Sequence, residues 1–374
     1  MNPRCLFFLC LLLLPLATQA QHAHSHADSR AITFPDVAGY QTLACDFHMH
    51  SVFSDGAVWP TVRVQEALRD SLDAIAITEH LEYQPHQDDI PHPDRNRAYD
   101  LAVEAAEGHD LIVIRGSEVT RSMPPGHTNA LFLDDANALL QDDSVAVFRE
   151  VRSQGGFAFW NHPNWTAQRP DGVATLTDLH RQFIEDGLLQ GIEVVNDVTY
   201  SDEALQIALD HDLTILGTSD IHGLVDWEYR VPEGGHRPVT LVFAEERSEA
   251  GIQEALEAGR TVAWFNNLLV GREPVLMPLL EASLAVTGAT YPDDISVLSV
   301  TIENTSDAAF LLDNQTSYTF HADADVITIG PHQTKTLEVK TADRLASVEL
   351  VFEVLNAVTA PDTHPRLVFD VQVD

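Results

Sequence analysis

The sequence predicts an α/β domain followed by a small all-β sandwich. Over residues 43–266, short apolar runs alternate with stretches of helical spacing. This is the pattern of a parallel α/β sheet, most economically a closed or distorted barrel. From residue 281 onward the helical spacing disappears, and apolar and polar residues alternate, as in residues 298–302. A chain of 374 residues also has room for two domains, at about 150 residues each.

Eight apolar runs are short enough to be strands, and most are rich in β-branched or aromatic residues. They span residues 43–47, 74–78, 111–115, 129–133, 157–160, 192–195, 214–217 and 239–243. Five intervening stretches carry apolar residues three or four positions apart, which is the spacing of a buried helical face. These predicted helices span residues 62–72, 97–107, 144–154, 202–210 and 248–258.

The domain boundary is predicted near residue 270. We assign residues 42–269 to the barrel, residues 270–280 to a linker and residues 281–374 to the sandwich. The last segment is close in length to an immunoglobulin-like domain. No motif within it indicates an activity.

The N-terminus has the pattern of a cleavable signal peptide. Residues 1–20 hold one positive charge, an apolar run and small residues at the end. The run is shorter than the ~20 apolar residues of a membrane-spanning helix, so we expect a periplasmic or secreted protein with no anchor after cleavage. Cys45 would then remain alone, and no internal disulfide is expected. Residues 21–41 are predicted as a leader, whose histidines at 22–26 form either a flexible polar tract or a metal-scavenging tail.

The charge of the chain restricts its partners. There are 57 acidic and 21 basic side chains, for a formal net charge of -36, and the two lysines are Lys335 and Lys340. Such a chain repels nucleic-acid backbones and anionic lipid headgroups, which argues against coating nucleic acid or binding membranes through a basic patch. It also disfavours an anionic substrate unless bound cations balance the charge. The oligomeric state is left open.

Histidines and carboxylates recur just past the predicted strand ends, where barrel enzymes place their active sites. His48 and His50 project to the same side of an extended backbone and can therefore bind one ion together. Nitrogen and carboxylate ligands without thiolates suit Zn, Mn or Fe. The set exceeds the needs of one ion, so we expect two or three divalent metal ions. The candidate ligands are His48, His50, Asp55, His80, Glu118, His127, His162, Asp220 and His222.

Five motifs in this order resemble the polymerase and histidinol phosphatase (PHP) family. They are Asp-X-His-X-His-Ser with Ser-Asp-Gly from residue 46, Thr-Glu-His at 78, Gly-Ser-Glu at 116, Asn-His-Pro at 161 and Ser-Asp-Ile-His-Gly at 219. The resemblance covers residues 42–266. It implies a distorted seven-stranded β/α (TIM-like) barrel with a metal cluster at the carboxyl ends of its strands.

The resemblance also implies three metal positions. The first would be held by His48, His50, Glu118 and Asp220, the second by the bridging Glu118 with His127 and His162, and the third by Asp55, His80 and His222. Asp46 and Glu79 match positions that flank ligands, and we expect them to orient the imidazoles.

The activity that the resemblance implies is hydrolysis of small-molecule phosphate esters, mono- or diesters, by a metal-bridged hydroxide. Glu118, Asp220 and His222 would then be the catalytic residues. Two alternatives remain: an amide or ester hydrolase that uses the same cluster, and a non-catalytic metal-binding protein. Both lysines lie in the β domain, so no carbamylated lysine can bridge metals in the barrel.

Substrate contacts are assigned from position along the chain. Arg121, Arg230 and Arg237 are candidate phosphate-binding residues, with structural ion pairs as the alternative. His236 is a candidate proton donor to the leaving group, with solvent exposure as the alternative. Trp165 and Trp227 are candidate pocket walls, for which a packing role is the more common outcome.

Overall fold

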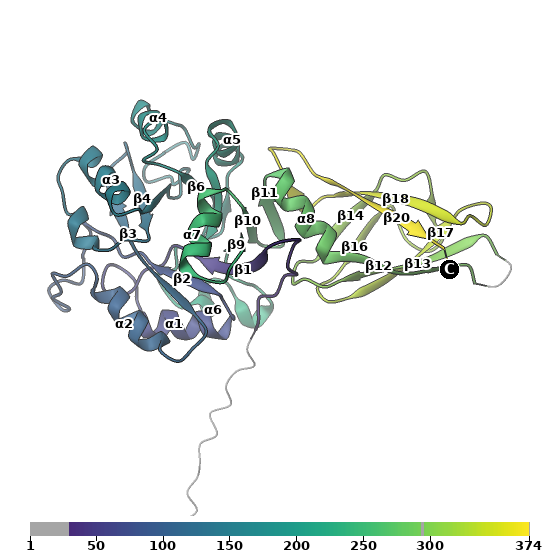
Figure 1. Ribbon diagram of the computed structural model, residues 1–374, viewed down its shortest axis with the longest axis horizontal. Helices are drawn as coiled ribbons and strands as arrows, with labels where there is room; N and C mark the ends of the chain where they lie inside the picture. Colours follow the sequence, from purple (N-terminus) through teal and green to yellow (C-terminus); the bar gives the residue numbers. More distant parts are fainter. Residues whose placement is uncertain (1–29, 293–294, 374) are drawn as a thin grey trace, which may run out of the picture.

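The structure is a computed structural model that describes residues 30–292 and 295–373. An α/β domain and a β-sandwich lie end to end along the long axis of the molecule (Figure 1). The predicted signal peptide and the histidine tract at 22–26 lie outside the described residues. Within the described ranges, the helices are all too short or too polar to cross a membrane.

The α/β domain is built on one long sheet. In the part of the chain that the structure describes, this sheet has 12 strands, in the order β19-β11-β10-β9-β1-β2-β3-β4-β5-β6-β7, with β8 paired to β6. Its strands are β1 (Gln41–Asp46), β2 (Ala74–Ile77), β3 (Ile112–Thr120), β4 (His127–Leu131), β5 (Phe157–Trp160), β6 (Gly191–Asn196), β7 (Thr199–Tyr200), β8 (Thr214–Thr218), β9 (Val239–Ala244), β10 (Thr261–Phe265), β11 (Leu268–Gly271) and β19 (Ala357–Val358). All eight predicted strands are present, with ends shifted by a few residues.

The prediction of a purely parallel sheet is wrong. Strands β1, β2 and β3 are parallel, and so are β5, β6 and β8. Strand β4, however, is antiparallel to both β3 and β5, and β9 is antiparallel to β1 and β10. Only residues 121–126 separate β3 from β4. A parallel crossover needs a dozen residues or more, so this connection can only make a hairpin.

The sheet curls until β8 meets β9 and β10, which distorts the barrel at its closure. The Thr240 hydroxyl accepts a hydrogen bond from the Gly217 N–H at 3.1 Å and donates to the Gly217 carbonyl at 2.8 Å. The Thr261 hydroxyl donates to the Ile215 carbonyl at 2.6 Å. A Cβ on Gly217 would lie 2.7 Å from the Cβ of Ala263, so this close approach requires glycine. Side-chain hydroxyls therefore replace part of the backbone ladder here.

Seven α-helices of the described chain surround this sheet (Figure 1). They are α1 (Pro60–Arg69), α2 (Arg97–Ala106), α3 (Ser144–Ser153), α4 (Asp178–Glu185), α5 (Asp202–His211), α6 (Val225–Glu228) and α7 (Glu249–Glu257). The five predicted helices correspond to α1, α2, α3, α5 and α7. Helix α4 was not predicted, because it is short and its cap is unusual: Thr177 and His180 form the capping box, where glutamate or glutamine is the common partner.

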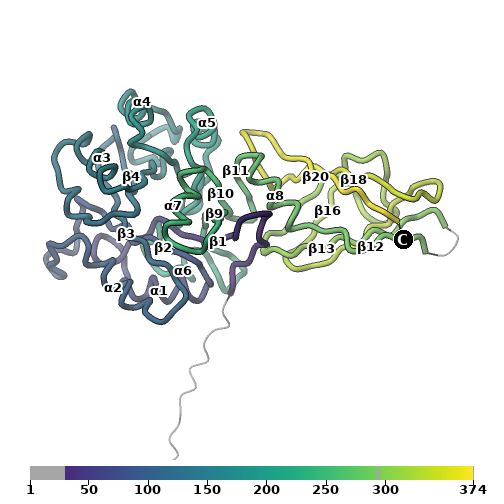
Figure 2. The backbone as a smooth tube through the Cα atoms, viewed as in Figure 1, coloured from purple at the N-terminus to yellow at the C-terminus, as the bar shows by residue number. Residues whose placement is uncertain are grey.

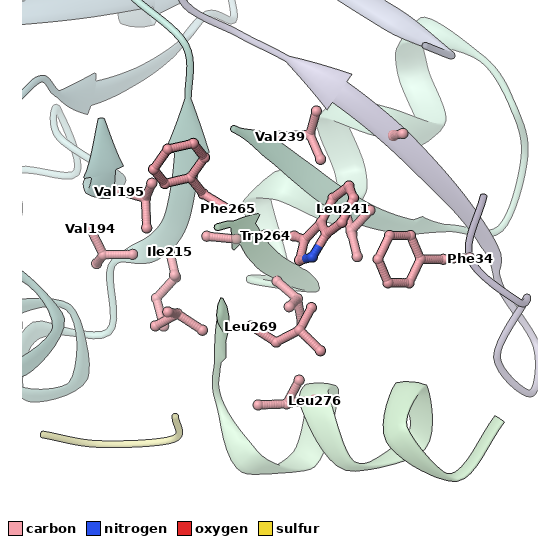
Figure 3. Close-up of a cluster of buried hydrophobic side chains, with 14 of the residues drawn as sticks. Phe34, Val194, Val195, Ile215, Val239, Leu241, Trp264, Phe265, Leu269 and Leu276 are labelled. Atoms are coloured by element: carbon pink, nitrogen blue, oxygen red, sulfur yellow. The ribbon is translucent and has the colours of Figure 1, made fainter. Parts of the chain in front are cut away.

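The core beneath the barrel closure includes the N-terminal segment. Figure 3 shows Trp264 packed among Leu241, Leu269 and other apolar side chains, with Phe34 beside it. The rings of Phe34 and Trp264 meet edge-on, with centroids 5.0 Å apart. Residues 30–40 were predicted to belong to a leader, but Phe34 and Ile32 are buried. Burial of these two apolar side chains fixes the segment against the barrel.

The C-terminal domain consists of two four-stranded antiparallel sheets. One contains β12 (Leu284–Thr290), β13 (Val297–Asn304), β17 (Thr334–Lys340) and β15 (Thr319–Phe320), and the other β16 (Val326–Ile329), β14 (Phe310–Asn314), β18 (Ser347–Val354) and β20 (Arg366–Gln372). Alternate residues of β13, β18 and β20 are buried, as a sandwich requires. The predicted fold class, a distorted β/α barrel followed by an all-β sandwich, is confirmed.

The segment predicted as a linker is structured. Residues 270–280 comprise the end of β11 and most of helix α8 (Glu273–Ser283), which buries Leu276, Leu279 and Leu280. Pro274 lies in the first turn of this helix, where proline is tolerated. Figure 2 shows the loop between β18 and β20 reaching back to the barrel, where β19 pairs in parallel with β11. The sandwich therefore contributes a strand to the sheet of the barrel.

We expect Asn356 to be a stabilising residue of this junction. Its amide donates to the carbonyls of Asn267 at 2.6 Å and Ala309 at 2.8 Å, and it accepts from the Leu311 N–H at 2.8 Å. Asn356→Ala leaves these groups unpaired and should lower the free energy of unfolding by about 2 kcal/mol, measured by urea denaturation. Glu349→Ala changes an exposed side chain of the same domain and should have little effect. Equal stability of the two variants would contradict this role.

His180 should make the barrel acid-sensitive. Burial, helped by the charges of Arg169 and Arg181, lowers the pKa of His180 to about 4. The neutral ring donates from Nε2 to the Pro125 carbonyl at 2.6 Å and accepts from the Thr177 N–H at 3.3 Å. The unfolded chain, with a histidine pKa near 6.5, binds the proton first as the pH falls.

His180 therefore contributes up to about 3 kcal/mol to the free energy of unfolding. This contribution is complete above pH ~6.5 and is lost as the pH falls toward 4. His180→Gln retains a capping-box side chain and does not titrate. The difference in free energy of unfolding between pH 7 and pH 5 should be smaller in this variant than in the wild type. The exposed His109 provides the control, His109→Gln. A pH dependence unchanged by His180→Gln would contradict the assignment.

Candidate metal centre

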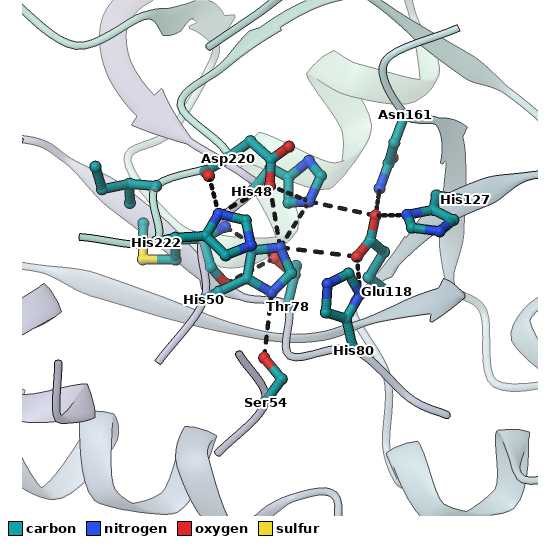
Figure 4. A network of polar contacts seen from close by, with 12 residues as sticks. His48, His50, Ser54, Thr78, His80, Glu118, His127, Asn161, Asp220 and His222 are labelled. Carbon is teal, nitrogen blue, oxygen red and sulfur yellow. Dashed lines mark hydrogen bonds and ion pairs between the residues drawn. The ribbon is translucent and has the colours of Figure 1, made fainter. Parts of the chain in front are cut away.

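All nine predicted metal ligands come together at one end of the barrel, and Figure 4 shows seven of them, without Asp55 and His162. His48 and His50 follow β1, His80 follows β2, Glu118 lies on β3, His127 begins β4, His162 follows β5, and Asp220 and His222 follow β8. Asp55 lies in the loop between β1 and α1. Isolated bridges beyond the strands align Met49 with Ile221 and His80 with Glu118. The extended strand ends therefore converge as predicted.

The first group of ligand atoms contains His48, His50 and Asp220. The Nε2 atoms of His48 and His50 are 3.0 Å apart, and each lies 3.1 Å from Oδ1 of Asp220. Oε1 of Glu118 is 3.5 Å from Nε2 of His48. Asp220 has a φ of 50°, a backbone conformation that non-glycine residues adopt at a cost. The Asp220 N–H donates to the His48 carbonyl at 2.9 Å, which helps to hold this conformation.

The second group surrounds Glu118, which is completely buried. Nδ1 of His127 lies 3.0 Å and Nε2 of His162 lies 3.4 Å from Oε1 of Glu118. Asn161 donates from Nδ2 to the same oxygen at 2.8 Å. Nδ1 of His80 contacts the other oxygen, Oε2. The structure thus adds His80 to the surroundings of the predicted second position.

The third group contains Asp55, His80 and His222, with His50 at its edge. Nε2 of His80 lies 3.3 Å from Oδ2 of Asp55, and Nε2 of His222 lies 3.1 Å from Oδ1 of Asp55. Nδ1 of His50 is 3.8 Å from Oδ1 of Asp55. His222 is the most exposed of the ligand side chains, at 38%. This group therefore lies nearest to solvent.

Buried atoms of these groups lack the hydrogen bonds that buried oxygens normally make. Oε2 of Glu118 and Oδ1 of Asp55 have no hydrogen-bond donor among the described residues. Their contacts are with imidazole nitrogens of His50, His80 and His222. Unpaired buried oxygens facing ring nitrogens match the donor set of a divalent cation.

The electrostatics of the site reflect its excess of carboxylate. Burial alone would lower the pKa of His48, but Asp220, Glu193 and Glu118 outweigh it and raise this pKa to about 10. The pKa of His80 is likewise raised to about 11. Although burial opposes ionisation, the charges of His80 and His48 hold the pKa of Glu118 well below its usual range. Without cations, protonated imidazoles balance the charge of the carboxylates.

Glu193 is a functional residue that the sequence analysis missed. His48 donates from Nδ1 to Glu193 at 2.7 Å, the Thr218 hydroxyl donates to it at 2.6 Å, and so does the His162 N–H at 2.6 Å. Glu193 is buried in the apolar strand β6. A carboxylate within an otherwise apolar strand was the available signal. Its bond to Nδ1 leaves Nε2 of His48 free to bind a cation.

Asp46 and Glu79 have a different role from the predicted one. The Ser219 N–H and hydroxyl donate to Asp46 at 3.1 and 2.6 Å. Glu79 accepts from the Ser51 N–H at 3.1 Å and from the Ser54 hydroxyl at 2.5 Å. Neither carboxylate contacts an imidazole ring within the described chain. They hold the loops that carry the candidate ligands, because Ser219 directly precedes Asp220, and Ser51 and Ser54 lie between His50 and Asp55.

The predicted phosphate-binding arginines have other contacts. Arg237 is fully buried and pairs with Asp70 at 2.9 Å and Asp46 at 3.3 Å. Arg121 pairs with Glu82 at 2.6 Å and donates to the Asp142 carbonyl at 2.9 Å. In each case nearby carboxylates, abundant in this acidic chain, bind the guanidinium. Arg230 is exposed and lies outside the pocket at the metal centre.

His236 is not positioned as a proton donor to a substrate. Its ring stacks on Trp264 with centroids 3.7 Å apart, and it does not line the pocket. Burial lowers the pKa of His236 to about 4, so the ring is neutral at pH 7. The sequence placed it in the loop after β8, but that loop continues past the pocket to the core beneath the barrel closure.

A cavity of about 490 Å³ opens beside the ligand groups. It is lined by ligands such as His127, His162 and His222, and by Trp165. Trp165 contacts the rings of His127 and His162, with centroids 5.4 and 5.1 Å away. Trp227, the other predicted wall, is 78% exposed and does not line the cavity.

Comparisons with known proteins match both domains. Residues 284–370 match a family model described as an Ig-like domain. The chain is similar to a two-domain protein of Bacteroides vulgatus that contains a predicted PHP-like metal-dependent phosphoesterase. The identity is 43%, 91% of this chain and 98% of that chain are covered, and the TM-score is 0.85. No curated protein matches the chain.

Two other similarities are partial. One is to a suggested metal-dependent phosphoesterase of Bifidobacterium adolescentis, with 20% identity over 48% of this chain and 88% of that chain and a TM-score of 0.38. The other is to an amidohydrolase of Chromobacterium violaceum, with 19% identity over 48% and 87% and a TM-score of 0.34. Neither bears on function. The extensive match to the Bacteroides vulgatus protein shows that this chain belongs to the same PHP-like family of two-domain proteins.

Proposed function

We propose that this protein is a metal-dependent hydrolase that cleaves phosphate esters of small molecules. The observation that carries the proposal is the position of Glu118. Its carboxylate lies between the group of His48, His50 and Asp220 and the group of His127 and His162. A carboxylate shared by two donor sets is suited to bridge two cations, as a two-metal hydrolase requires.

The donor chemistry supports two or three bound Mn, Fe or Zn ions. When bound, such ions lower the pKa of coordinated water toward ~7 and neutralise the phosphate oxygens. Hydrolysis then breaks the bond between phosphorus and the ester oxygen, with OH from water going to phosphorus and a proton to the departing alcohol. The described lining of the cavity contains no arginine or lysine, so bound cations would have to balance the phosphate charge.

The protein residues supply position and charge. Glu118 and Asp220 stay ionised, because charged imidazoles around them offset their burial and lower the pKa of each. Glu193 orients His48 through Nδ1. Asp220 and His222 are among the candidate ligands that line the cavity and would face a bound ester. The relationship to a protein described as a predicted phosphoesterase also supports this reaction. An extracytoplasmic location, expected from the N-terminal sequence, is part of the proposal.

Loss of Glu118 should abolish turnover and reduce metal content. We expect Glu118→Gln to lower kcat/KM for p-nitrophenyl phosphate or its bis-diester by at least ~100-fold, because the bridging charge is removed. Elemental analysis should show fewer ions per chain. Glu254→Gln, an exposed change far from the ligands, serves as the control. Turnover of an amide or carboxylic ester, but of neither phosphate ester, by the metal-loaded protein would contradict the proposal.

Glu193 should affect metal binding without contacting the metal. Glu193→Gln replaces the acceptor of the His48 Nδ1–H bond with a neutral amide, and we expect metal affinity to fall by ~10–100-fold. Competition with a chelating dye on metal-depleted protein measures this change, with Glu254→Gln again as the control. An unchanged dissociation constant would show that the orientation of His48 does not depend on Glu193.

A further inference from the structure

The cavity beside the metal centre is lined by polar groups that have unused hydrogen-bonding capacity. Apart from the ligands, its polar lining consists of Asn164, Thr166, Asn196, Asp197, Thr199 and Glu228. These are amides, hydroxyls and carboxylates, with no cation among the described lining residues. Such a surface suits a substrate with many hydroxyl groups and offers no cationic side chain to a second phosphate.

Several of these groups have no partner within the described chain. Asp197 accepts from the Tyr229 hydroxyl at 3.3 Å through Oδ1, which leaves Oδ2 without a side-chain partner. Glu228 accepts from the Gly223 N–H at 2.7 Å through Oε1 only. Asn196 uses Nδ2 to donate to Glu193 and Asp220, and its side-chain oxygen Oδ1 accepts no hydrogen bond from the described residues. The side chains of Asn164 and Thr166 make no hydrogen bond to described residues. Both donors and acceptors are therefore available.

Trp165 provides an apolar wall next to these groups. It is 44% exposed, and its ring is held in place by the imidazoles of His127 and His162. The flat face of an indole packs against the C–H face of a saturated ring, while the hydroxyls at the edge of that ring reach polar neighbours. Its contact with two ligand rings also places it directly beside the reacting group.

We propose that the leaving group is a sugar or a cyclic polyol. Resting on the proposed phosphoesterase function, this assigns Trp165 as the surface on which the ring packs, and Asp197, Glu228 and Asn164 as the groups that bind its hydroxyls. A cavity of about 490 Å³ is within the ~300–1,000 Å³ range of small-molecule sites and accommodates a phosphate with one such ring. The absence of arginine and lysine from the described lining disfavours nucleotides, whose further phosphates would have no cationic side chain within this cavity.

A cationic alcohol is the competing leaving group, because two carboxylates line the cavity. It would leave the donors of Asn164 and Thr166 unpaired, whereas hydroxyls act as both donors and acceptors. A panel of esters separates these cases. It contains hexose 1- and 6-phosphates, inositol 1-phosphate, cyclohexylmethyl phosphate with the ring but no hydroxyls, and phosphocholine with a cation.

With the Mn-loaded protein, we expect kcat/KM for the best sugar or inositol ester to exceed that for the other two by at least ~10-fold. Sites that bind a hydroxyl discriminate against analogues that lack it, because their polar groups are left unpaired. Equal or faster turnover of cyclohexylmethyl phosphate, or preference for phosphocholine, overturns the proposal. If no ester, including p-nitrophenyl phosphate, is hydrolysed, the phosphoesterase function fails. In that case, the dissociation constants of the same esters are measured by calorimetry. Tighter binding of the sugar or inositol ester than of cyclohexylmethyl phosphate and phosphocholine supports the proposed leaving group, and the reverse order overturns it.

Variants test the assigned residues. Asp197→Ala should lower the ratio of kcat/KM for the sugar ester to that for cyclohexylmethyl phosphate by at least ~5-fold, with metal content unchanged. Trp165→Ala should lower kcat/KM for both ring esters, because it removes the packing surface. The matched control is Trp227→Ala. Trp227 precedes Glu228 in the sequence, but its indole is exposed and does not line the cavity. Equal effects of Trp165→Ala and Trp227→Ala would overturn the role of Trp165.

Discussion

Glu118 is a buried carboxylate whose described neighbours are the imidazoles of five histidines and the amide of Asn161. Burying a charge of this kind is costly unless positive charge lies beside it. The fold meets this requirement by ending several strands at the same point, so that each contributes a ring nitrogen. Protonated histidines can supply this positive charge, because the pKa values of His48 and His80 are raised by the surrounding carboxylates. The convergence of histidines at this end of the barrel thus balances the negative charge of Glu118.

A second constraint acts on the backbone of the loops. The buried Arg63, on α1, donates to the carbonyls of His50 at 2.8 Å and His222 at 2.8 Å, and it pairs with Glu66 at 2.7 Å. Glu66 in turn accepts from the Val225 N–H at 2.9 Å. One guanidinium therefore joins the loops after β1 and β8, which hold five of the candidate ligands. The position of His50 relative to His222 depends on a residue that never contacts a cation or a substrate.

The convergence of the candidate ligands could be predicted from sequence because most of them obey short-range rules. His48 and His50 alternate along the extended segment after β1, and each remaining candidate except Asp55 lies within a few residues of a strand end, whereas Asp55 lies in the loop between β1 and α1. The supporting contacts could not be predicted, because they join residues far apart in the chain. His48 and Glu193 are separated by 145 residues, and Arg237 reaches Asp46 across 191. The ion pairs of Arg121 and Arg237, which were the alternative to phosphate binding, could not be predicted for the same reason, because their carboxylate partners lie on distant segments. The segment predicted as a linker contains most of helix α8, whose buried Leu276, Leu279 and Leu280 pack against the rest of the chain.

The pairing of β19 with β11 has a mechanical consequence. Two backbone segments from different domains share a ladder, and Asn356 adds side-chain bonds across the same junction. A hinge motion at this junction would have to break those hydrogen bonds. We therefore expect the barrel and the sandwich to move as one unit. Within the described chain, the cavity is lined by barrel residues alone. The sandwich therefore does not need to close over a substrate to complete the walls of the cavity. If the sandwich binds to a surface, this rigid junction also sets the direction in which the cavity of the barrel opens relative to that surface.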